Sequence, residues 1–208
     1  MCIRYIWYKN NFSLLVFSLT AILFGSFDRI IGAEKLDVAD FASLAFLALF
    51  FNAAQMFQSM INSLFLPYLT KIILIKGAKH VIVMSCVLSC GILALILILL
   101  YLANELGYMY LKAIFHKFDI DIYLLYLSSI IFALKASDYF GNIFLILKKE
   151  LTLIIMRFFI VTLAGTYLII FGNTIKDIIN VLLLANLGYY VAAICGSLLY
   201  LDKHKYNI

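Results

Sequence analysis

The sequence predicts an all-α integral membrane protein, a bundle of about six transmembrane helices. Hydrophobic residues make up 66% of the chain and charged residues only 13%, and the mean hydropathy is +1.08. A soluble domain has roughly a quarter of its residues charged, so much of the usual solvating surface is missing. The apolar runs are continuous and close to the length of a membrane-spanning helix. With a single proline in 208 residues, they favour helices over the short alternating segments of a β-barrel.

Polar clusters divide the chain into six apolar runs, which we interpret as the spans of a single bundle covering residues 1–208. The predicted spans are residues 12–31, 41–75, 81–103, 122–147, 151–171 and 175–201. The first ends in Asp28 and Arg29, which are expected to lie at the membrane interface, where long side chains reach the polar side. The second is unusually long, and Pro67 is expected to break it. The linker 104–121 is interpreted as an interfacial helix or loop.

Basic residues predict the orientation of the bundle. Lys and Arg accumulate on the cytoplasmic side of membrane proteins. Ten lie in or near the loops of one side: Arg4, Lys9, Lys71, Lys76, Lys79, Lys148, Lys149, Arg157, Lys203 and Lys205. Five lie on the other: Arg29, Lys35, Lys112, Lys117 and Lys176. Both termini are therefore predicted to be cytoplasmic, in the cell inner membrane. The net charge of +5 fits this topology and needs no nucleic-acid partner.

The sequence contains no recognisable motif for catalysis or cofactor binding. There is no glycine-rich phosphate loop, no nucleophile elbow and no cluster of metal ligands. The three histidines are isolated from one another, and the four cysteines lie in or beside apolar runs without disulfide-framework spacing. We therefore expect a protein that is not an enzyme, with no catalytic residue, cofactor or metal.

One polar stripe crosses the second apolar run. Its members recur at steps of three and four residues and occupy about 120° of a helix that turns about 100° per residue. They are Asn52, Gln55, Gln58, Ser59 and Asn62. Two interpretations stay open: the stripe lines a polar cavity, or its amides join neighbouring helices through hydrogen bonds worth about 0.6 kcal/mol each. The first makes these residues part of a substrate pathway.

A second polar stripe, about 80° wide, runs through the fourth predicted span. It comprises Ser128, Lys135, Asp138 and Asn142. A charge at the bilayer centre costs about 2.5–3.5 kcal/mol, so the stripe is expected to face the bundle interior. Lys135 and Asp138 are three residues apart and are predicted to pair on one helical face. The pair either lowers the cost of insertion alone or borders a hydrated pathway that binds a charged substrate group or a coupling ion.

Several segments resemble one transporter family. Residues 27–32 (FDRIIG) precede a short acidic loop, and a long helix then runs from residues 42–46 (ASLAF) to residues 66–69 (LPYL). Residues 110–115 (YLKAIF) look like a short amphipathic stretch. Together they resemble the C-terminal half of Wzx-type polysaccharide and O-antigen flippases of the multidrug/oligosaccharidyl-lipid/polysaccharide exporter superfamily. The resemblance extends over nearly the whole chain and implies one half of a two-bundle, MATE-like fold.

The resemblance implies a transporter, or transporter half, that flips undecaprenyl-pyrophosphate-linked oligosaccharide across the cytoplasmic membrane for surface polysaccharide and lipopolysaccharide biosynthesis. Lys135 and Arg29 would be head-group contacts, and the amide stripe would face sugar hydroxyls. Such a machine needs a second bundle. The chain is therefore expected to be a truncated product, half of a split transporter or a unit that pairs with a second copy. The alternatives are a cation-coupled multidrug exporter fragment, with Asp138 as the coupling site, and a membrane subunit or enzyme without transport activity.

Overall fold

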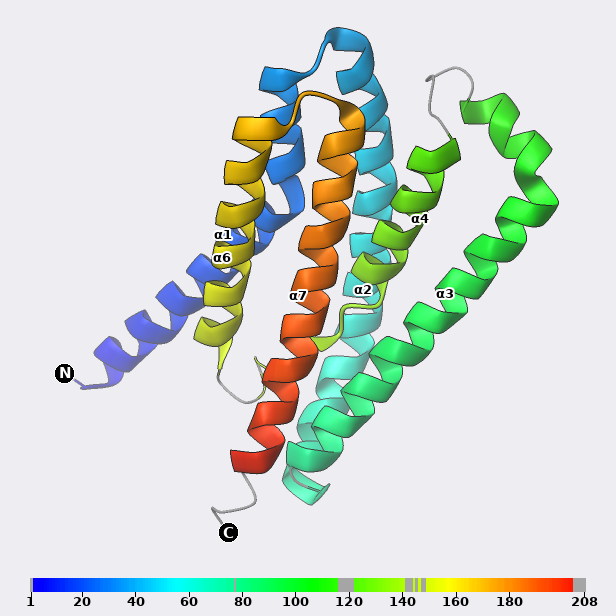
Figure 1. Cartoon of the computed structure of the whole chain (residues 1–208). Helices are drawn as coiled ribbons and strands as arrows, with labels where there is room; N and C mark the ends of the chain where they lie inside the picture. The colour runs from blue at the N-terminus through cyan, green and yellow to red at the C-terminus, as the bar shows by residue number, and fades with distance from the viewer. Residues whose placement is uncertain are drawn as a thin grey trace.

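The computed structural model of the chain describes residues 2–76, 78–115, 122–140, 144, 146 and 149–203, and within these ranges it is helical apart from short connections. This part of the chain folds into six helices and contains no strand, and Figure 1 shows the helices packed in one bundle. The helices are α1 (Cys2–Lys35), α2 (Val38–Lys76), α3 (Ala78–Phe115), α4 (Ile122–Ala136), α6 (Glu150–Phe171) and α7 (Ile175–Lys203). The predicted all-α class is confirmed.

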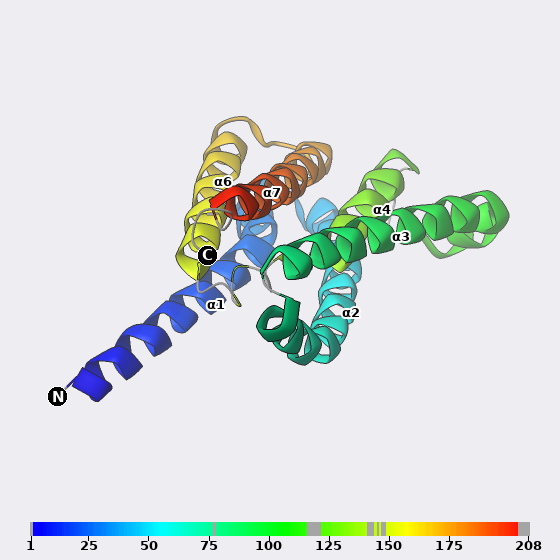
Figure 2. The same cartoon turned by 90° about the horizontal axis from the view of Figure 1, so that it is seen from below.

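The helices form two groups of three. α1, α6 and α7 pack against one another, and so do α2, α3 and α4. Seen from below, the two groups lie on opposite sides of the bundle (Figure 2). Contacts of α7 with α2, α3 and α4, and of α1 with α2, join them. Any site at this junction therefore takes side chains from both groups.

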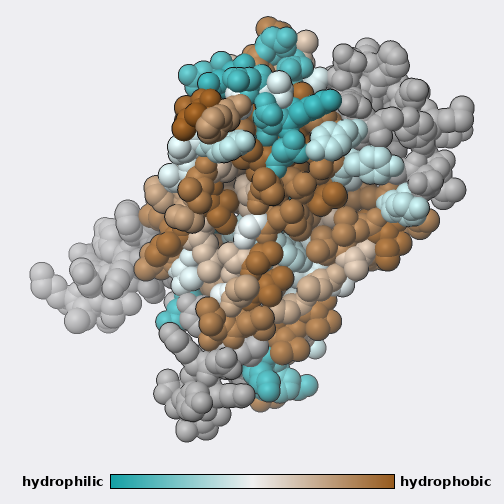
Figure 3. All heavy atoms as spheres, in the orientation of Figure 1, coloured by the Kyte–Doolittle hydropathy of each residue, from teal (hydrophilic) through white to brown (hydrophobic). Residues whose placement is uncertain are grey.

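The outer surface is suited to lipid. Leucine, isoleucine, valine and phenylalanine side chains are exposed along the five longer helices, among them Leu49, Val87, Phe158 and Leu199, and α4 exposes Tyr123 and Tyr126. Figure 3 shows this apolar surface over the middle of one face, with hydrophilic residues gathered toward its two ends. Four described helices are long and apolar enough to cross a membrane, over Val38–Ile72, Lys79–Leu102, Leu151–Phe171 and Ile175–Leu199, and α4 is apolar but shorter. The chain is thus a multi-pass membrane protein by helix length and composition.

Local signals set the helix ends between α6 and α7. The Gly172 N–H caps α6 by donating to the Leu168 carbonyl oxygen at 2.8 Å. Thr174 and Asp177 then form a reciprocal cap for α7. The Asp177 carboxylate accepts the Thr174 N–H at 3.0 Å, and the Thr174 hydroxyl oxygen accepts the Asp177 N–H at 3.3 Å. At the start of α2 the Asp37 carboxylate accepts the Asp40 N–H at 2.8 Å.

Two expected interruptions are absent from the structure. α2 continues through Pro67, because a proline removes only one N–H donor and a membrane helix with good neighbours tolerates the loss. α3 continues to Phe115, so the part of the linker 104–121 that is described belongs to the same helix as the third predicted span. Its 38 residues extend about 57 Å at about 1.5 Å per residue. That is almost twice the thickness of about 30 Å of a bilayer core.

The fourth predicted span, residues 122–147, is wrong as one continuous helix. α4 ends at Ala136, with Ser137 in a turn and Asp138 outside the helix. The Ser137 hydroxyl donates to the carbonyl oxygen of Ala133 at 2.7 Å, and such side-chain bonds compete with the helical ladder. The Tyr139 N–H donates to the Ser137 carbonyl oxygen at 3.0 Å and to the Ser89 hydroxyl of α3 at 3.4 Å, so it does not continue the hydrogen-bond ladder of α4.

Gly32 lets α1 approach α2 closely. A methyl group there would lie 2.5 Å from Cδ2 of Leu44, which is completely buried. We expect Gly32→Ala to lower the free energy of unfolding by about 1–3 kcal/mol through overpacking. Thermal unfolding in detergent micelles measures this. Gly91→Ala is the matched control, because no heavy atom lies within 4 Å of its added methyl, and it is expected to gain up to about 1 kcal/mol of helix propensity. An equal loss at both positions would contradict this packing.

Candidate substrate pocket

A polar pocket of about 350 Å³ lies at the junction of the two helix groups. It takes side chains from α1, α2, α6 and α7 and from the end of α4. Its polar and charged lining consists of Ser26, Arg29, Gln55, Gln58, Lys135, Asp138, Arg157, Asn186, Tyr189 and Tyr190. A cavity of this size suits a small ligand or one head group. We call it the junction pocket.

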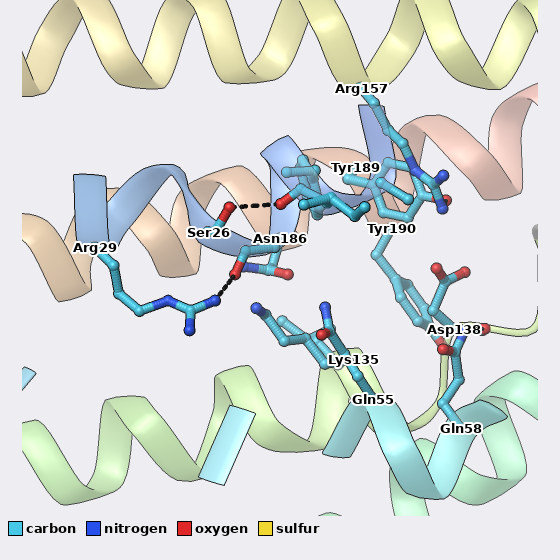
Figure 4. A pocket seen from close by; sticks show the side chains of 15 residues that line it. Ser26, Arg29, Gln55, Gln58, Lys135, Asp138, Arg157, Asn186, Tyr189 and Tyr190 are labelled. Carbon is cyan, nitrogen blue, oxygen red and sulfur yellow. Dashed lines mark hydrogen bonds between the residues drawn. The ribbon is translucent and has the colours of Figure 1, made fainter. Parts of the chain in front are cut away.

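Lys135 and Arg29 lie toward one end of the junction pocket, together with Gln55 and Asn186 (Figure 4). Lys135 is only 6% exposed, and its Nζ has no hydrogen-bond partner among the described residues. It lies 5.2 Å from the centroid of the Phe51 ring, within range of a cation–π interaction. Arg29 donates to the Gly25 carbonyl oxygen of its own helix at 3.2 Å. This end of the pocket therefore presents two cations, one of them buried and without a hydrogen-bonded anion.

The structure corrects the expected position of Asp28. The carboxylate is not interfacial: it is 1% exposed, and its Oδ1 has no hydrogen-bond partner in the described part of the chain. Its position follows from the length of α1, which continues for almost two turns beyond Asp28 to Lys35. Its neighbours Phe27 and Ile31 belong to the apolar core, so Asp28 lies on the inner face of the helix.

The other end of the pocket is built around Tyr189. The Arg157 guanidinium donates to the Tyr189 hydroxyl at 3.3 Å and lies 5.4 Å from the centroid of its ring. The Tyr189 hydroxyl also hydrogen bonds the Asp138 side chain. Figure 4 shows Arg157, Asp138 and Gln58 gathered at this end with the two tyrosines. The Arg157 guanidinium and the Asp138 carboxylate thus both contact the hydroxyl of Tyr189.

The prediction that Lys135 and Asp138 pair on one helical face is wrong. α4 ends between them, so the three-residue spacing does not place them on a common face. Both still line the junction pocket, Lys135 toward the end with Arg29 and Asp138 toward the end with Tyr189. Gln58 of α2 donates through its side-chain amide to the backbone carbonyl oxygen of Asp138, which ties α2 to the segment that follows α4.

The polar stripe on α2 lines two different cavities. Gln55 and Gln58 line the junction pocket, whereas Asn52 and Ser59, with Gln55, line an open groove along α2. Asn62 is half-buried and lines neither cavity. A stripe about 120° wide is broad enough to meet two different neighbours. Gln55 and Gln58 line a cavity, as in the first interpretation, and the Gln58 amide also donates to the backbone of the segment that follows α4 rather than to a neighbouring helix.

Two residues of the second stripe lie apart from the junction pocket or outside the described ranges. Ser128 is buried on α4, and its hydroxyl has no hydrogen-bond partner among the described residues, but it does not line the pocket. Asn142 lies outside the described residues. Of the predicted pathway and head-group residues, the structure therefore brings together Arg29, Gln55, Gln58, Lys135 and Asp138.

Sequence reasoning missed Arg157, Asn186 and Tyr189. Arg157 was counted with the charges of a cytoplasmic loop, yet it lies two turns inside α6 and is half-buried. The insertion cost that singled out Lys135 applies equally to a charge within residues 151–171 and could have found it. Asn186 is 4% exposed and lies in the middle of α7. An amide in the middle of an apolar run also costs free energy to insert, though less than a charge does. Tyrosine is enriched at membrane interfaces and the chain has 14 of them, so nothing in the sequence singled out Tyr189.

Comparison with known protein families, curated proteins and solved structures finds no match to this chain. The fold and the pocket define the class: an all-α, multi-pass membrane bundle with a pocket, lined by polar and charged side chains, between two groups of helices.

Proposed function

We propose that the chain is a membrane transporter, or a transporter half, that flips a lipid-linked oligosaccharide across the cytoplasmic membrane. The observation that carries the proposal is the buried ammonium of Lys135, which faces the junction pocket without a hydrogen-bond partner among the described residues. A buried charge is costly unless something compensates it. An anionic head group that enters the pocket would supply the compensation and would be bound selectively.

The charges of the pocket favour an anion over a cation. Three cations line it, Arg29, Lys135 and Arg157, against one lining carboxylate, Asp138, and the Asp28 carboxylate that interacts with Lys135 from outside the lining. A pyrophosphate group carries negative charge that these residues can neutralise, and arginine and lysine are the usual phosphate-binding side chains. The cation-coupled drug exporter is the second candidate, because Asp28 and Asp138 are carboxylates at or beside the pocket. A cationic drug would be repelled by the three cations, so the anionic substrate is the better fit.

The size of the pocket limits what it can hold. A volume of about 350 Å³ accommodates a head group but not a chain of several sugars. The sugars would have to extend from the pocket, and the amides and hydroxyls along α2 at Asn52, Gln55 and Ser59 offer hydrogen bonds next to it. The polyprenyl chain would stay in the lipid. In this proposal the substrate is undecaprenyl-pyrophosphate-linked oligosaccharide for O-antigen or another surface polysaccharide.

Complementation of a flippase-deficient strain tests the proposal. The chain is expressed alone, and with a candidate N-terminal bundle, and surface polysaccharide is measured. The Lys135→Gln variant is then made in whichever of these two forms, the chain alone or the chain with the N-terminal bundle, restores export. It is expected to reduce surface polysaccharide at least tenfold, because the head group loses a hydrogen bond to a charged donor worth about 1.5–3 kcal/mol. Lys71→Gln is the matched control, since Lys71 is an exposed lysine near the end of α2. Membrane insertion of both variants is checked by immunoblotting. Normal export by Lys135→Gln would remove Lys135 from the mechanism.

A further inference from the structure

Asp28 is a buried titratable group that the proposed head-group contacts do not use. It belongs to α1 in one helix group, while Lys135 belongs to α4 in the other. Asp28 Oδ1 and Lys135 Nζ both lack hydrogen-bond partners among the described residues. The attraction between the two charges is the largest favourable electrostatic interaction that either group has. The pair therefore spans the junction without a direct hydrogen bond to hold it.

The charges around Asp28 define what it can bind. Its own helix contributes Arg29, α6 contributes Arg157, and Lys135 and Asp138 lie in and after α4. α2 and α7 contribute only neutral groups to the pocket: Gln55 and Gln58 from α2, and Asn186, Tyr189 and Tyr190 from α7. A metal cation would be repelled by Lys135 and Arg29. A buried carboxylate with an unsatisfied oxygen instead binds a proton, because protonation removes the cost of a desolvated charge.

We propose that Asp28 is a proton-binding site whose occupancy controls how tightly the junction pocket holds an anion. The proton comes from hydronium in the aqueous phase: the carboxylate becomes a carboxylic acid and hydronium becomes water. Lys135 then loses its internal counter-charge and is free to bind the anion. Because the anion is taken to be the head group of the substrate, this inference rests on the proposed function. It makes the proton the coupling ion of the proposed transport.

The charge balance of the pocket gives the direction of the effect. With Asp28 ionised, Arg29, Lys135 and Arg157 face two carboxylates, which leaves one net positive charge. With Asp28 protonated, the same cations face Asp138 alone, which leaves two. A dianion is therefore held more tightly at low pH. By linkage, its binding raises the proton affinity of Asp28 by the same factor, and couplings of this kind are typically about 5–150-fold.

Calorimetric titration with sulfate tests the proposal on the purified full chain in non-ionic detergent. Sulfate stays a dianion throughout the range used, so any pH dependence belongs to the protein. We expect wild-type affinity to fall at least fivefold from about pH 5 to about pH 8. The side chain at position 28 of Asp28→Asn is neutral at every pH, so at both pH values this variant is expected to bind sulfate as tightly as the wild type does at low pH. Glu34→Gln is the matched control, because Glu34 is an exposed carboxylate on the same helix outside the pocket, and it is expected to keep both the affinity and the pH dependence of the wild type.

Infrared difference spectroscopy provides a second measurement that does not depend on sulfate. Lowering the pH is expected to produce a buried carboxylic acid C=O band in the wild type and in Lys135→Gln. The band is expected to be absent from the double variant Asp28→Asn/Lys135→Gln. This variant leaves neither charge buried without its counter-charge, so it is expected to fold even if Asp28→Asn alone does not.

The outcomes separate the two proposals. Sulfate binding that is independent of pH in the wild type, or a pH dependence that survives in Asp28→Asn, would overturn proton control by Asp28. So would a carboxylic acid band that persists in the double variant. If these tests succeed while complementation fails, the proton-controlled anion site stands, and only the transport of a lipid-linked sugar is rejected.

Discussion

Replacing Asp28 with leucine is expected to lower the free energy of unfolding by about 3–5 kcal/mol, because Lys135 then remains as a buried charge without its counter-charge. Asp28 is 1% exposed and Lys135 6% exposed, so solvent compensates neither. Unfolding in detergent micelles by titration with dodecyl sulfate measures the loss. Asp37→Leu would not serve as a control, because Asp37 caps α2. Glu34→Leu does serve, since Glu34 is an exposed acidic residue on the same helix.

The double variant Asp28→Leu/Lys135→Met is expected to recover the stability that the single change loses. Buried ion pairs replaced by apolar side chains of similar volume are often neutral, or more stable by about 1–4 kcal/mol. The interaction energy follows from a double-mutant cycle with the two single variants. If the double variant were as unstable as the sum of the single ones, Asp28 and Lys135 would be energetically independent. The proton-binding proposal would then lose its physical basis.

The same double variant separates stability from function. It is expected to fold at least as well as the wild type and yet to bind sulfate poorly and to fail in complementation, because its pocket has lost one cation and the proton site. A protein can be stabilised by deleting a polar feature that its activity needs. Such a result would show that the buried pair is kept for ligand binding, since the fold does not require it.

Composition and apolar run length were enough to predict the all-α membrane bundle and the approximate position of each helix, because the lipid core imposes both. The inward position of Lys135 was predictable for the same reason: a charge in the middle of an apolar run costs too much to face lipid. The end of α4 was not predictable from that signal. It depends on the Ser137 hydroxyl bond to Ala133 and on the Tyr139 contact with Ser89 of another helix.

The failures at Asp28 and Arg157 have different causes. Asp28 lies near the end of an apolar run, where the sequence alone favours an interfacial position, but α1 continues to Lys35, so Asp28 lies further inside its helix than the run suggests. Arg157 already lay inside the predicted run 151–171, since α6 begins at Glu150, and it was assigned to a loop without its insertion cost being applied. The hydrophilic residues that extend these helices, such as Glu34 and Lys35, can sit in the polar region and leave Asp28 within the packed bundle. The length of the apolar runs therefore predicted the helices, but not how deeply the charged residues near their ends are buried.

Phe51→Ala is expected to cost about 3–5 kcal/mol, as for other buried phenylalanines truncated to alanine. Phe51 is 2% exposed and packs in the core that joins both helix groups, with Leu44 and Leu47 of the same helix. Dodecyl sulfate titration in detergent micelles measures the change. The adjacent Phe50 is 40% exposed and supplies the control, with an expected cost below about 1 kcal/mol for Phe50→Ala. Similar losses at both positions would contradict the orientation of α2.

Phe51→Leu separates the packing of the ring from its contact with Lys135. Leucine keeps the site filled with apolar atoms but lacks the ring face that lies 5.2 Å from the ammonium, and cation–π contacts are worth about 0.5–2 kcal/mol. The cost of Phe51→Leu is therefore expected to be larger when Lys135 is present than in a Lys135→Met background, by an amount in that range. Equal costs in the two backgrounds would mean that the ring does not stabilise the charge. If the costs differ as expected, Phe51 helps to hold the Lys135 ammonium in the junction pocket before any anion arrives, which is the preorganisation that an anion-binding site needs.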